Sequence, residues 1–145
     1  MEISLEDAVY GEKNIFGAFL EEYWGEIDPD FKKTRKFIDK YLEYLFHNHQ
    51  RKVSWICAKK ERIGLVVYYF YNSLGFSEQN LHISEFFIRK EYRRQGAGRK
   101  TIEKLSSSYP VKEFRLEALK SNEAGVRFWQ SLGFEPWKYI MKKTR

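Results

Sequence analysis

One stretch of the sequence restricts the fold more than any other. An apolar segment at 81–88 runs without a break into the basic turn R-K-E-Y-R-R-Q-G-A-G-R-K, and a helical pattern begins near Gly98. Gly96 and Gly98 allow backbone angles that other residues rarely adopt, and they keep side chains out of the turn. A strand that enters a helix through such a turn is typical of a sheet covered by helices, so we predict an α/β domain.

The hydrophobic pattern extends this prediction to the whole chain. The predicted elements are helices at 14–24 and 30–48, strands at 53–58, 63–71 and 81–88, a helix from 98, a strand at 111–119, a helix from 122 and a closing strand at 134–141. Asp28 or Asp30 is expected to cap the second helix, and Gly133 to end the last one. No repeat or linker divides the 145 residues, so a single domain over 1–145 is predicted.

Composition narrows the class of protein. The one cysteine, Cys57, excludes a disulfide framework and is expected to be a buried thiol. No run of about eighteen apolar residues is present and the first residues are acidic, so neither a membrane span nor a signal peptide is expected. Aromatic residues make up 18% of the chain, which argues against disorder. We therefore expect a soluble, globular protein of the cytoplasm.

The net charge of +6 is unevenly distributed. The first thirty residues hold nine acidic side chains and one basic one, Lys13, so the rest of the chain is strongly basic. Within 89–104, seven side chains are basic and two are acidic. The basic segment indicates an anionic ligand, while the acidic first fifth argues against a uniformly basic grip on nucleic acid. Two surfaces of opposite charge are suited to two different ligands.

The basic glycine turn is a candidate anion site. Backbone N–H groups around Gly96 and Gly98 can converge on an oxyanion, helped by the positive end of the following helix. The spacing does not match a phosphate-binding G-x-x-x-x-G-K-[ST] loop, and Thr101 stands where a dinucleotide fingerprint has its third glycine. From the residues alone, the open alternatives are a pyrophosphate cradle without a metal and an ordinary turn with a solvated basic face.

Two motifs resemble those of the GCN5-related N-acetyltransferase (GNAT) superfamily. The segment R-R-Q-G-A-G is similar to that family's R-x-x-G-x-G/A motif, with Arg93, Gly96 and Gly98 in the matching positions. The segment N-E-A-G-V-R-F-W-Q-S-L-G-F is similar to the second signature, N-x-x-A-x-x-x-Y-x-x-x-G-F. Its matching residues are Asn122, Ala124, Gly133 and Phe134, while Trp129 replaces the usual tyrosine.

The resemblance implies a fold and a co-substrate. The implied fold is a three-layer α/β (mixed α+β) domain: a mostly antiparallel mixed sheet with one parallel βαβ unit, flanked by about four helices. The implied enzyme is an N-acetyltransferase that uses acetyl-CoA and no metal. The strands at 81–88 and 114–119 would be parallel and splayed to admit the cofactor.

The resemblance also assigns cofactor contacts to particular residues. Its pyrophosphate would lie on backbone amides of the basic turn, and its pantetheine arm along the edge of the strand before that turn. Asn122 and the helix that carries Trp129 would face the thioester end. The implied contacts are Phe86, Phe87, Ile88, Arg93, Arg94, Gln95, Gly96, Ala97, Gly98, Arg99, Asn122 and Trp129.

His82 and Glu85 are the candidate general bases. An amine acceptor is almost wholly protonated at neutral pH, so a positioned base must take its proton. Regular alternation would place His82, Ser84 and Phe86 on one face of the strand and Glu85 on the other, and a β-bulge would change that count. A structural role remains open for both. The general acid is unassigned because indole cannot supply the proton, which leaves Tyr139, solvent or a loss of activity as alternatives.

The acidic first fifth is the candidate acceptor side. The resemblance implies that the first two helices and their connection border the acceptor, and acids with aromatics suit a cationic amine. The predicted substrate-binding residues are Glu21, Glu22, Tyr23, Trp24 and Glu26. We expect a small amine, a polyamine or a lysine-containing peptide, although a solvated acidic helix face is an open alternative.

Two other functions remain open at this stage. One is a non-catalytic acetyl-CoA-binding sensor, which Trp129 motivates. The other is a nucleic-acid-binding module built on the basic segment, which the acidic first thirty residues and the two motifs disfavour. The exposed aromatics and the closing strand also make a homodimer a reasonable expectation.

Overall fold

The computed structural model describes residues 1–28, 30, 34–72 and 79–145, and in that part of the chain the sheet has five strands. They lie in sequence order: β1 (Ile3–Asp7), β2 (Lys52–Ala58), β3 (Glu61–Asn72), β4 (Gln79–Ile88) and β5 (Phe114–Leu116). Neighbours from β1 to β4 pair antiparallel, and β5 pairs parallel to β4. The predicted mixed sheet with one parallel unit is confirmed.

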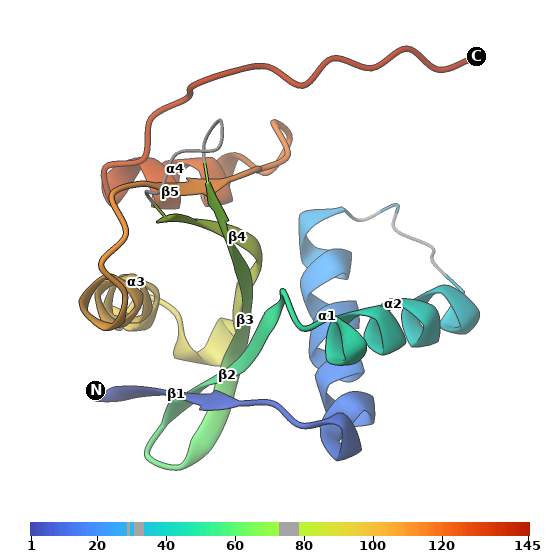
Figure 1. Ribbon diagram of the computed structural model, residues 1–145, viewed down its shortest axis with the longest axis vertical. Helices are drawn as coiled ribbons and strands as arrows, with labels where there is room; N and C mark the ends of the chain where they lie inside the picture. Colours follow the sequence, from blue (N-terminus) through green and yellow to red (C-terminus); the bar gives the residue numbers. More distant parts are fainter. Residues whose placement is uncertain (29, 31–33, 73–78) are drawn as a thin grey trace.

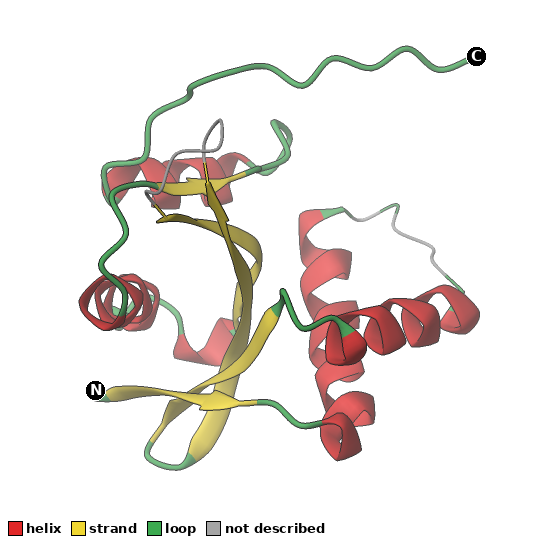
Figure 2. Cartoon of the chain, viewed as in Figure 1, coloured by secondary structure: helices red, strands yellow, loops and turns green. Residues whose placement is uncertain are grey.

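Helices cover both faces of this sheet (Figures 1 and 2). α1 (Lys13–Ile27) and α2 (Arg35–His47) lie on one face, and α3 (Ala97–Ser108) and α4 (Glu123–Ser131) lie on the other. Two short 3-10 turns, η1 (Tyr10–Glu12) and η3 (Lys90–Tyr92), precede α1 and the basic turn. The described residues therefore form the expected three layers with four helices.

Each face of the sheet has its own apolar core. The cluster under α1 and α2 is aromatic-rich and includes Phe16, Phe19, Trp55 and Phe87. The cluster under α3 consists mostly of aliphatic side chains, and Phe86 and Trp129 pack against its border. Because buried side chains line both faces, β3 is a nearly continuous apolar run from Ile63 to Tyr71 rather than an alternating one.

A β-bulge interrupts β4 at Ser84. Val67 of β3 faces Glu85, but the next residue, Tyr68, faces Ile83, so Ser84 has no partner of its own. An extra residue of this kind shifts the alternation of all side chains beyond it by one. The bulge therefore decides which residues of β4 share a face.

Three details differ from the expected elements. The pattern misses β1, where Ile3 and Leu5 stand among acidic residues; Ile3 is nonetheless buried under α3. Thr34, not Asp28 or Asp30, caps α2: its hydroxyl accepts from the Phe37 N–H at 3.2 Å, because the helix begins only at Arg35. Part of the polar loop expected at 72–80 lies outside the described residues.

The end of the chain also differs. β5 covers 114–116 rather than 111–119, because it soon separates from β4. The closing strand expected at 134–141 is wrong for this chain: the segment is extended but pairs with no strand among the described residues. The turn before it follows the expectation, since Gly133 has φ +94° and the Phe134 N–H donates to the Trp129 carbonyl at 3.1 Å.

Candidate active site

The turn between η3 and α3 holds its backbone in a strained conformation. Arg94 has φ +63° and Gly96 has φ +80°, and left-handed angles of this kind are rare for a side chain such as arginine. Gly96 is the residue before α3 and offers no side-chain cap to the N–H groups of the first helical turn. Free amides at a helix start, next to left-handed residues, form a concave site for an anion.

Gly98 keeps the first turn of α3 close to α4. A Cβ at Gly98 would lie 2.6 Å from Cζ and 2.9 Å from Cε1 of the Phe128 ring. The Phe128 ring in turn stacks on the Phe86 ring, with 6.0 Å between the ring centroids. The Trp129 ring contacts Phe86 edge to face, with 5.0 Å between the centroids. The basic turn, α4 and the middle of β4 thus converge on one place.

β4 and β5 part at the same place. They pair only from Leu81 to Ile83, opposite Phe114 to Leu116, so β4 has no β5 partner from the bulge to Ile88. A gap between two parallel strands leaves backbone groups of β4 available to a ligand. The residues named for the cofactor, Phe86, Phe87 and Ile88, lie on this part of β4, but their side chains point to both faces.

Two of the three arginines predicted to contact the cofactor already have hydrogen-bond partners within the chain. Arg93 donates through Nε to the Ile88 carbonyl at 2.7 Å and pairs with Glu26. Arg99 donates to the Ser131 carbonyl at 3.2 Å. Among the residues named for the pyrophosphate, backbone amides are therefore better placed to bind it than the side chains of Arg93 and Arg99.

Asn122 has a structural role at the start of α4, where the sequence pattern places the beginning of a helix. Its side-chain oxygen accepts from the Gly125 N–H at 3.2 Å and caps α4. A Cβ at Gly125 would lie 2.4 Å from Asn122 Nδ2, so the cap needs glycine there. These contacts account for the side chain of Asn122 without a cofactor.

Glu85 lies between the sheet and the two helices of the acceptor side. Tyr41 of α2 donates to its Oε1 at 2.9 Å, and Trp24 of α1 donates through Nε1 to its Oε2 at 3.3 Å. Burial raises the pKa of the Glu85 carboxyl, and the two hydrogen bonds only partly offset that rise. A half-buried carboxylate with a raised pKa is suited to accept a proton near neutral pH.

His82 has a different environment. Its ring stacks on Tyr69 at 4.8 Å, and its Nδ1 accepts from Arg115 Nε at 3.3 Å. Burial and the charge of Arg115 lower the pKa of His82, so the neutral ring is favoured. Because Nδ1 is already occupied, only Nε2 is left for other partners.

Because of the bulge, the residues of β4 are distributed over its two faces differently from what regular alternation predicts. Ile83 and Phe86 both pack toward α3 and α4, although regular alternation would separate them. His82 and Glu85 consequently share the face that α1 and α2 cover, rather than lying on opposite faces. Ser84, the extra residue, is the physical reason.

Comparison with known proteins decides the family. Residues 17–134 match the family described as Acetyltransferase (GNAT) family, which is most of the chain and contains every element from α1 to α4 except the first residues of α1. The chain belongs to the acetyltransferase (GNAT) family. The resemblance inferred from two motifs is confirmed, and with it the enzyme class that the family defines.

Solved structures show that the fold is that of GNAT proteins. A possible acetyltransferase from Clostridium difficile 630 has a TM-score of 0.81 and 17% identity, and covers 100% of this chain and 98% of its own. A ribosomal-protein-alanine N-acetyltransferase from Brucella melitensis biovar Abortus 2308 has a TM-score of 0.77 and 14% identity. That match covers 99% of this chain and 100% of the Brucella chain.

A curated relative matches in sequence over a shorter region. The thialysine N-epsilon-acetyltransferase of Sus scrofa is 32% identical over 74 residues, which are 49% of this chain. The match covers 43% of that protein, so this chain aligns with less than half of the relative's length.

The acidic residues named for the acceptor of this GNAT protein have partners within the chain. Glu21 pairs with Arg35 at 3.4 Å, Glu22 with Arg89 at 3.4 Å, and Glu26 with Arg93. The first pair joins α1 to α2, and the other two join α1 to the residues around η3. Their charges therefore serve contacts between elements, whereas Tyr23 and Trp24 lie beside Glu85.

Tyr41 belongs to the candidate site, although its sequence context does not predict this. Its spacing in α2 is that of an apolar helix face, and nothing in the sequence connects it with Glu85, 44 residues away. It donates to Glu85, and burial together with the Glu85 charge raises the pKa of Tyr41. Tyr139, the residue named as a possible acid, is instead 93% exposed in the extended segment after α4.

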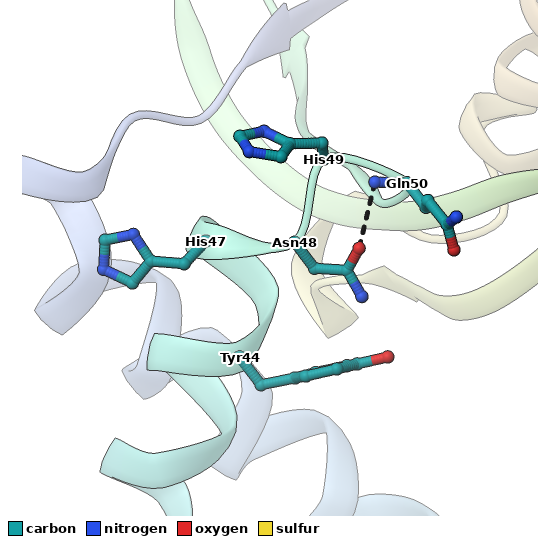
Figure 3. A pocket seen from close by; sticks show the side chains of 5 residues that line it. All are labelled: Tyr44, His47, Asn48, His49 and Gln50. Atoms are coloured by element: carbon teal, nitrogen blue, oxygen red, sulfur yellow. Dashed lines mark hydrogen bonds between the residues drawn. The ribbon is translucent and has the colours of Figure 1, made fainter.

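A hollow of about 530 Å³ lies elsewhere, at the end of α2. Tyr44, His47, Asn48, His49 and Gln50 line it, and Figure 3 shows the two imidazole rings lying apart from each other. The Gln50 N–H donates to Asn48 Oδ1 at 2.9 Å, which closes the turn after the helix. None of the residues named from the sequence for catalysis or binding lines this hollow.

Within the described ranges, no group of three or more His, Cys, Asp or Glu side chains is arranged to hold a metal ion. No helix in the same ranges combines the length and apolarity that a membrane crossing requires.

Proposed function

We propose that this chain is an acetyl-CoA-dependent N-acetyltransferase that acetylates a primary amine. The observation that carries the proposal is the position of Glu85, on the stretch of β4 that has separated from β5 and within reach of α1 and α2. Family membership supports acetyl-CoA as the co-substrate. The thialysine acetyltransferase similarity supports an amine as the acceptor.

The backbone of the basic turn would hold the donor. Amides of residues 94–99 would bind the pyrophosphate, because Arg94 and Gly96 give the turn its concave shape and no side chain caps α3. The free edge of β4 between the bulge and Ile88 would pair with the pantetheine arm. Acetyl-CoA supplies the activated acetyl group, and the protein supplies its alignment with the amine.

Glu85 would remove the proton that blocks the amine. An ammonium with a pKa near 10.4 needs roughly 4.6 kcal/mol to expose its lone pair at pH 7. Glu85 would take this proton directly or through water, and the nitrogen would then bond to the thioester carbonyl carbon as the carbon–sulfur bond breaks. The second proton that the nitrogen loses on becoming an amide would go to solvent. The thiolate would take its proton from solvent, since Trp129 lies among Phe86, Phe128 and Phe134 and has no acidic proton.

The acceptor would enter beside Trp24 and Tyr23. These rings and the Glu85 carboxylate make an aromatic and anionic environment, which suits a cationic amine. A lysine-like small molecule, a polyamine or a lysine-containing peptide fits this chemistry. Glu21, Glu22 and Glu26 would contribute only to the extent that the amine displaces their arginine partners.

The test begins with thermal unfolding in the presence of acetyl-CoA, CoA, dephospho-CoA and a short oligonucleotide. A ligand at 100 times its Kd stabilises a protein by about 2.7 kcal/mol, which is easily seen. Acetyl-CoA should raise the Tm and the oligonucleotide should not. No response to acetyl-CoA would overturn the proposal, and a response to the oligonucleotide alone would favour nucleic-acid binding.

A thiol-release assay then separates the enzyme from its alternative. Lysine, thialysine, spermidine and a lysine-containing peptide are the acceptors to screen. Turnover with any of them establishes the enzyme. Stabilisation by acetyl-CoA without turnover would instead favour the acetyl-CoA sensor, for which the observation is Trp129 at the position where a proton donor is expected.

A further inference from the structure

Two arginines, Arg51 and Arg115, lie against aromatic rings at the end of the sheet where β4 begins. The Arg51 guanidinium carbon is 3.9 Å from the centre of the Tyr69 ring. The corresponding distance from Arg115 to the Tyr71 ring is 4.0 Å. Both arginines are half-buried. A guanidinium held over a ring keeps the N–H groups of its edge for other partners, so both side chains are prepared to bind a ligand.

The pairing of the two parallel strands positions Arg115. It lies opposite His82 in the register of β4 and β5, and its Nε donates to His82 Nδ1 at 3.3 Å. The His82 ring is held in turn by stacking on Tyr69, with 4.8 Å between the ring centroids. No hydrogen bond joins the terminal nitrogens of Arg115 to another residue that the structure describes. The side chain is therefore fixed in place while its terminal N–H groups remain available.

Arg51 is connected to Glu85 through two tyrosines. It follows α2, and its Nη2 donates to the Tyr44 hydroxyl at 3.2 Å. The Tyr44 ring stacks on Tyr41, with 6.2 Å between the ring centroids, and the Tyr41 hydroxyl donates to Glu85. The contacts of Arg51 thus lead to the candidate base on one side and, through the ring on which it lies, to the other arginine. All of these side chains belong to one continuous group.

Neither arginine forms an ion pair with an acidic residue in the part of the chain that the structure describes. Four other arginines do form such pairs: Arg35, Arg62, Arg89 and Arg93. Glu113, close to Arg115 in sequence, instead accepts from the Tyr71 hydroxyl at 2.9 Å. Half-buried cations without a counter-charge lose hydration with no compensation, and an anionic group on a ligand would supply that compensation.

The charges around His82 are mostly positive. Burial lowers the pKa of His82, and the charges of Arg115 and Arg51 lower it further. Lys138 acts in the same direction, and Glu117 in the opposite one. Three cations and one acid therefore influence this imidazole, and the beginning of β4 attracts anions.

The positive end of β4 and Glu85 are spaced for one small molecule. His82 marks the positive end and lies three residues before Glu85, which is about 10 Å or less along the strand. The Glu85 carboxylate suits an ammonium, while the edge of a guanidinium matches the two oxygens of a carboxylate. A molecule with an amine at one end and a carboxylate at the other would satisfy both groups.

We propose that the acceptor is an amino acid with a second amine on its side chain, whose carboxylate Arg51 and Arg115 bind while its side-chain amine lies at Glu85. This inference rests on the function proposed above and narrows the class of its acceptor. A polyamine would instead place a second ammonium beside the two arginines, where like charges repel. Free lysine and ornithine have the required groups.

The experiment measures thiol release with two matched pairs of acceptors. Cadaverine is lysine without its carboxylate, and putrescine is ornithine without its carboxylate. Within at least one pair, kcat/KM for the amino acid should exceed that for the diamine about tenfold or more, because charge-assisted hydrogen bonds to the arginines form only with the amino acid.

Variants of the two arginines locate the effect. Arg51→Gln and Arg115→Gln should each raise KM for the amino acid about tenfold and leave KM for its diamine unchanged or lower. An unchanged diamine KM also shows that the variant is folded. Lys40→Gln is the matched control, because it removes one positive charge from an exposed position of α2 and should change neither KM.

The possible failures are distinguishable. Equal turnover of both members of each pair, or turnover of the diamines alone, overturns this inference and leaves the proposed function in place. The same holds if the two arginine variants raise both KM values equally. Release of no thiol with any amine overturns the proposed function, and this inference with it.

Discussion

Glu85 illustrates how a single residue acquires its chemistry from its surroundings. Burial under α1 and α2 raises the pKa of the carboxyl, while Tyr41 and Trp24 donate hydrogen bonds that favour the charged form. The first influence is the larger one. A base works best when its pKa lies close to the working pH, so the net rise suits the proposed proton transfer.

Replacement of this carboxylate gives the first prediction. Glu85→Gln keeps the size and the hydrogen bond from Tyr41 but removes the base, so kcat/KM should fall about 10²–10⁴-fold. Because the pKa of Glu85 is raised, activity should increase with pH as the carboxyl loses its proton, and the variant should lose that increase. Steady-state rates between pH 5 and pH 9 provide the measurement.

The matched comparison is His82→Gln on the same face of β4. His82 is held by Tyr69 and Arg115, and the contacts explain it as a structural residue. Its replacement should therefore reduce activity less than Glu85→Gln does and leave the pH profile in place. If His82→Gln causes the larger loss and moves the profile, the base is His82.

At the scale of elements, two ion pairs connect the acceptor side with the donor side. Glu22 and Glu26 of α1 reach Arg89 and Arg93, which flank η3 just before the basic turn. Arg93 also holds the Ile88 carbonyl at the end of β4. These contacts fix the position of the turn relative to α1, although the sequence places them more than sixty residues apart.

The second prediction concerns these pairs. Glu22→Gln and Glu26→Gln should each raise the Kd of acetyl-CoA by up to about fivefold at low salt, since exposed pairs contribute only about 0.2–1 kcal/mol. Glu21→Gln is the control, because Glu21 pairs with Arg35 of α2 and not with the turn. Calorimetric titration at low and high salt is the measurement. An equal effect of all three variants would show that α1 acts through its charge alone.

Most of the fold was predictable because its signals are local. The periodicity of α1, the strands from β2 to β4 and the Asn122 to Gly133 signature all depend on residues close together in sequence. β1 was not predictable from the sequence. Only two of its five residues are apolar, two others are acidic, and the strand conformation depends on pairing with β2. Its strand state is a tertiary effect.

The site was predictable only in part for a related reason. Glu85 stands out in sequence as a carboxylate directly before Phe86 and Phe87, but its face depends on the bulge at Ser84, which no local pattern locates. Tyr41 is a further case, since its role comes from the packing of α2 onto the sheet. The acids of α1 were named for their charge, and their arginine partners lie elsewhere in the sequence.

At the scale of the whole molecule, the sheet separates two environments. The face under α1 and α2 is aromatic and holds Glu85, while the face under α3 and α4 meets the basic turn. A donor at the gap between β4 and β5 would therefore contact both halves of the molecule. The weak point of this arrangement is the corner formed by β5 and α4, where no residue of α4 is fully buried.

The third prediction concerns the contact between α3 and α4. A Cβ at Gly98 would lie 2.6 Å from the Phe128 ring, so Gly98→Ala should destabilise the fold by about 1–3 kcal/mol and lower the Tm. Gly25→Ala in α1 is the control: a Cβ there meets no atom within 4 Å, so this change should keep or raise the Tm. Scanning calorimetry of both variants is the measurement, and an unchanged Tm in Gly98→Ala would contradict the prediction.

The four tryptophans lie in four different environments, which fluorescence can distinguish. Trp55 is fully buried in the core under α1 and α2, Trp24 touches Glu85, Trp129 packs on Phe86 beside the strand gap, and Trp137 is exposed in the extended segment after α4. Indole emission shifts with the polarity around each ring. Variants that retain one tryptophan at a time would therefore report folding of the core, acceptor entry, donor entry and the state of the last residues as four separate optical signals, without any added dye.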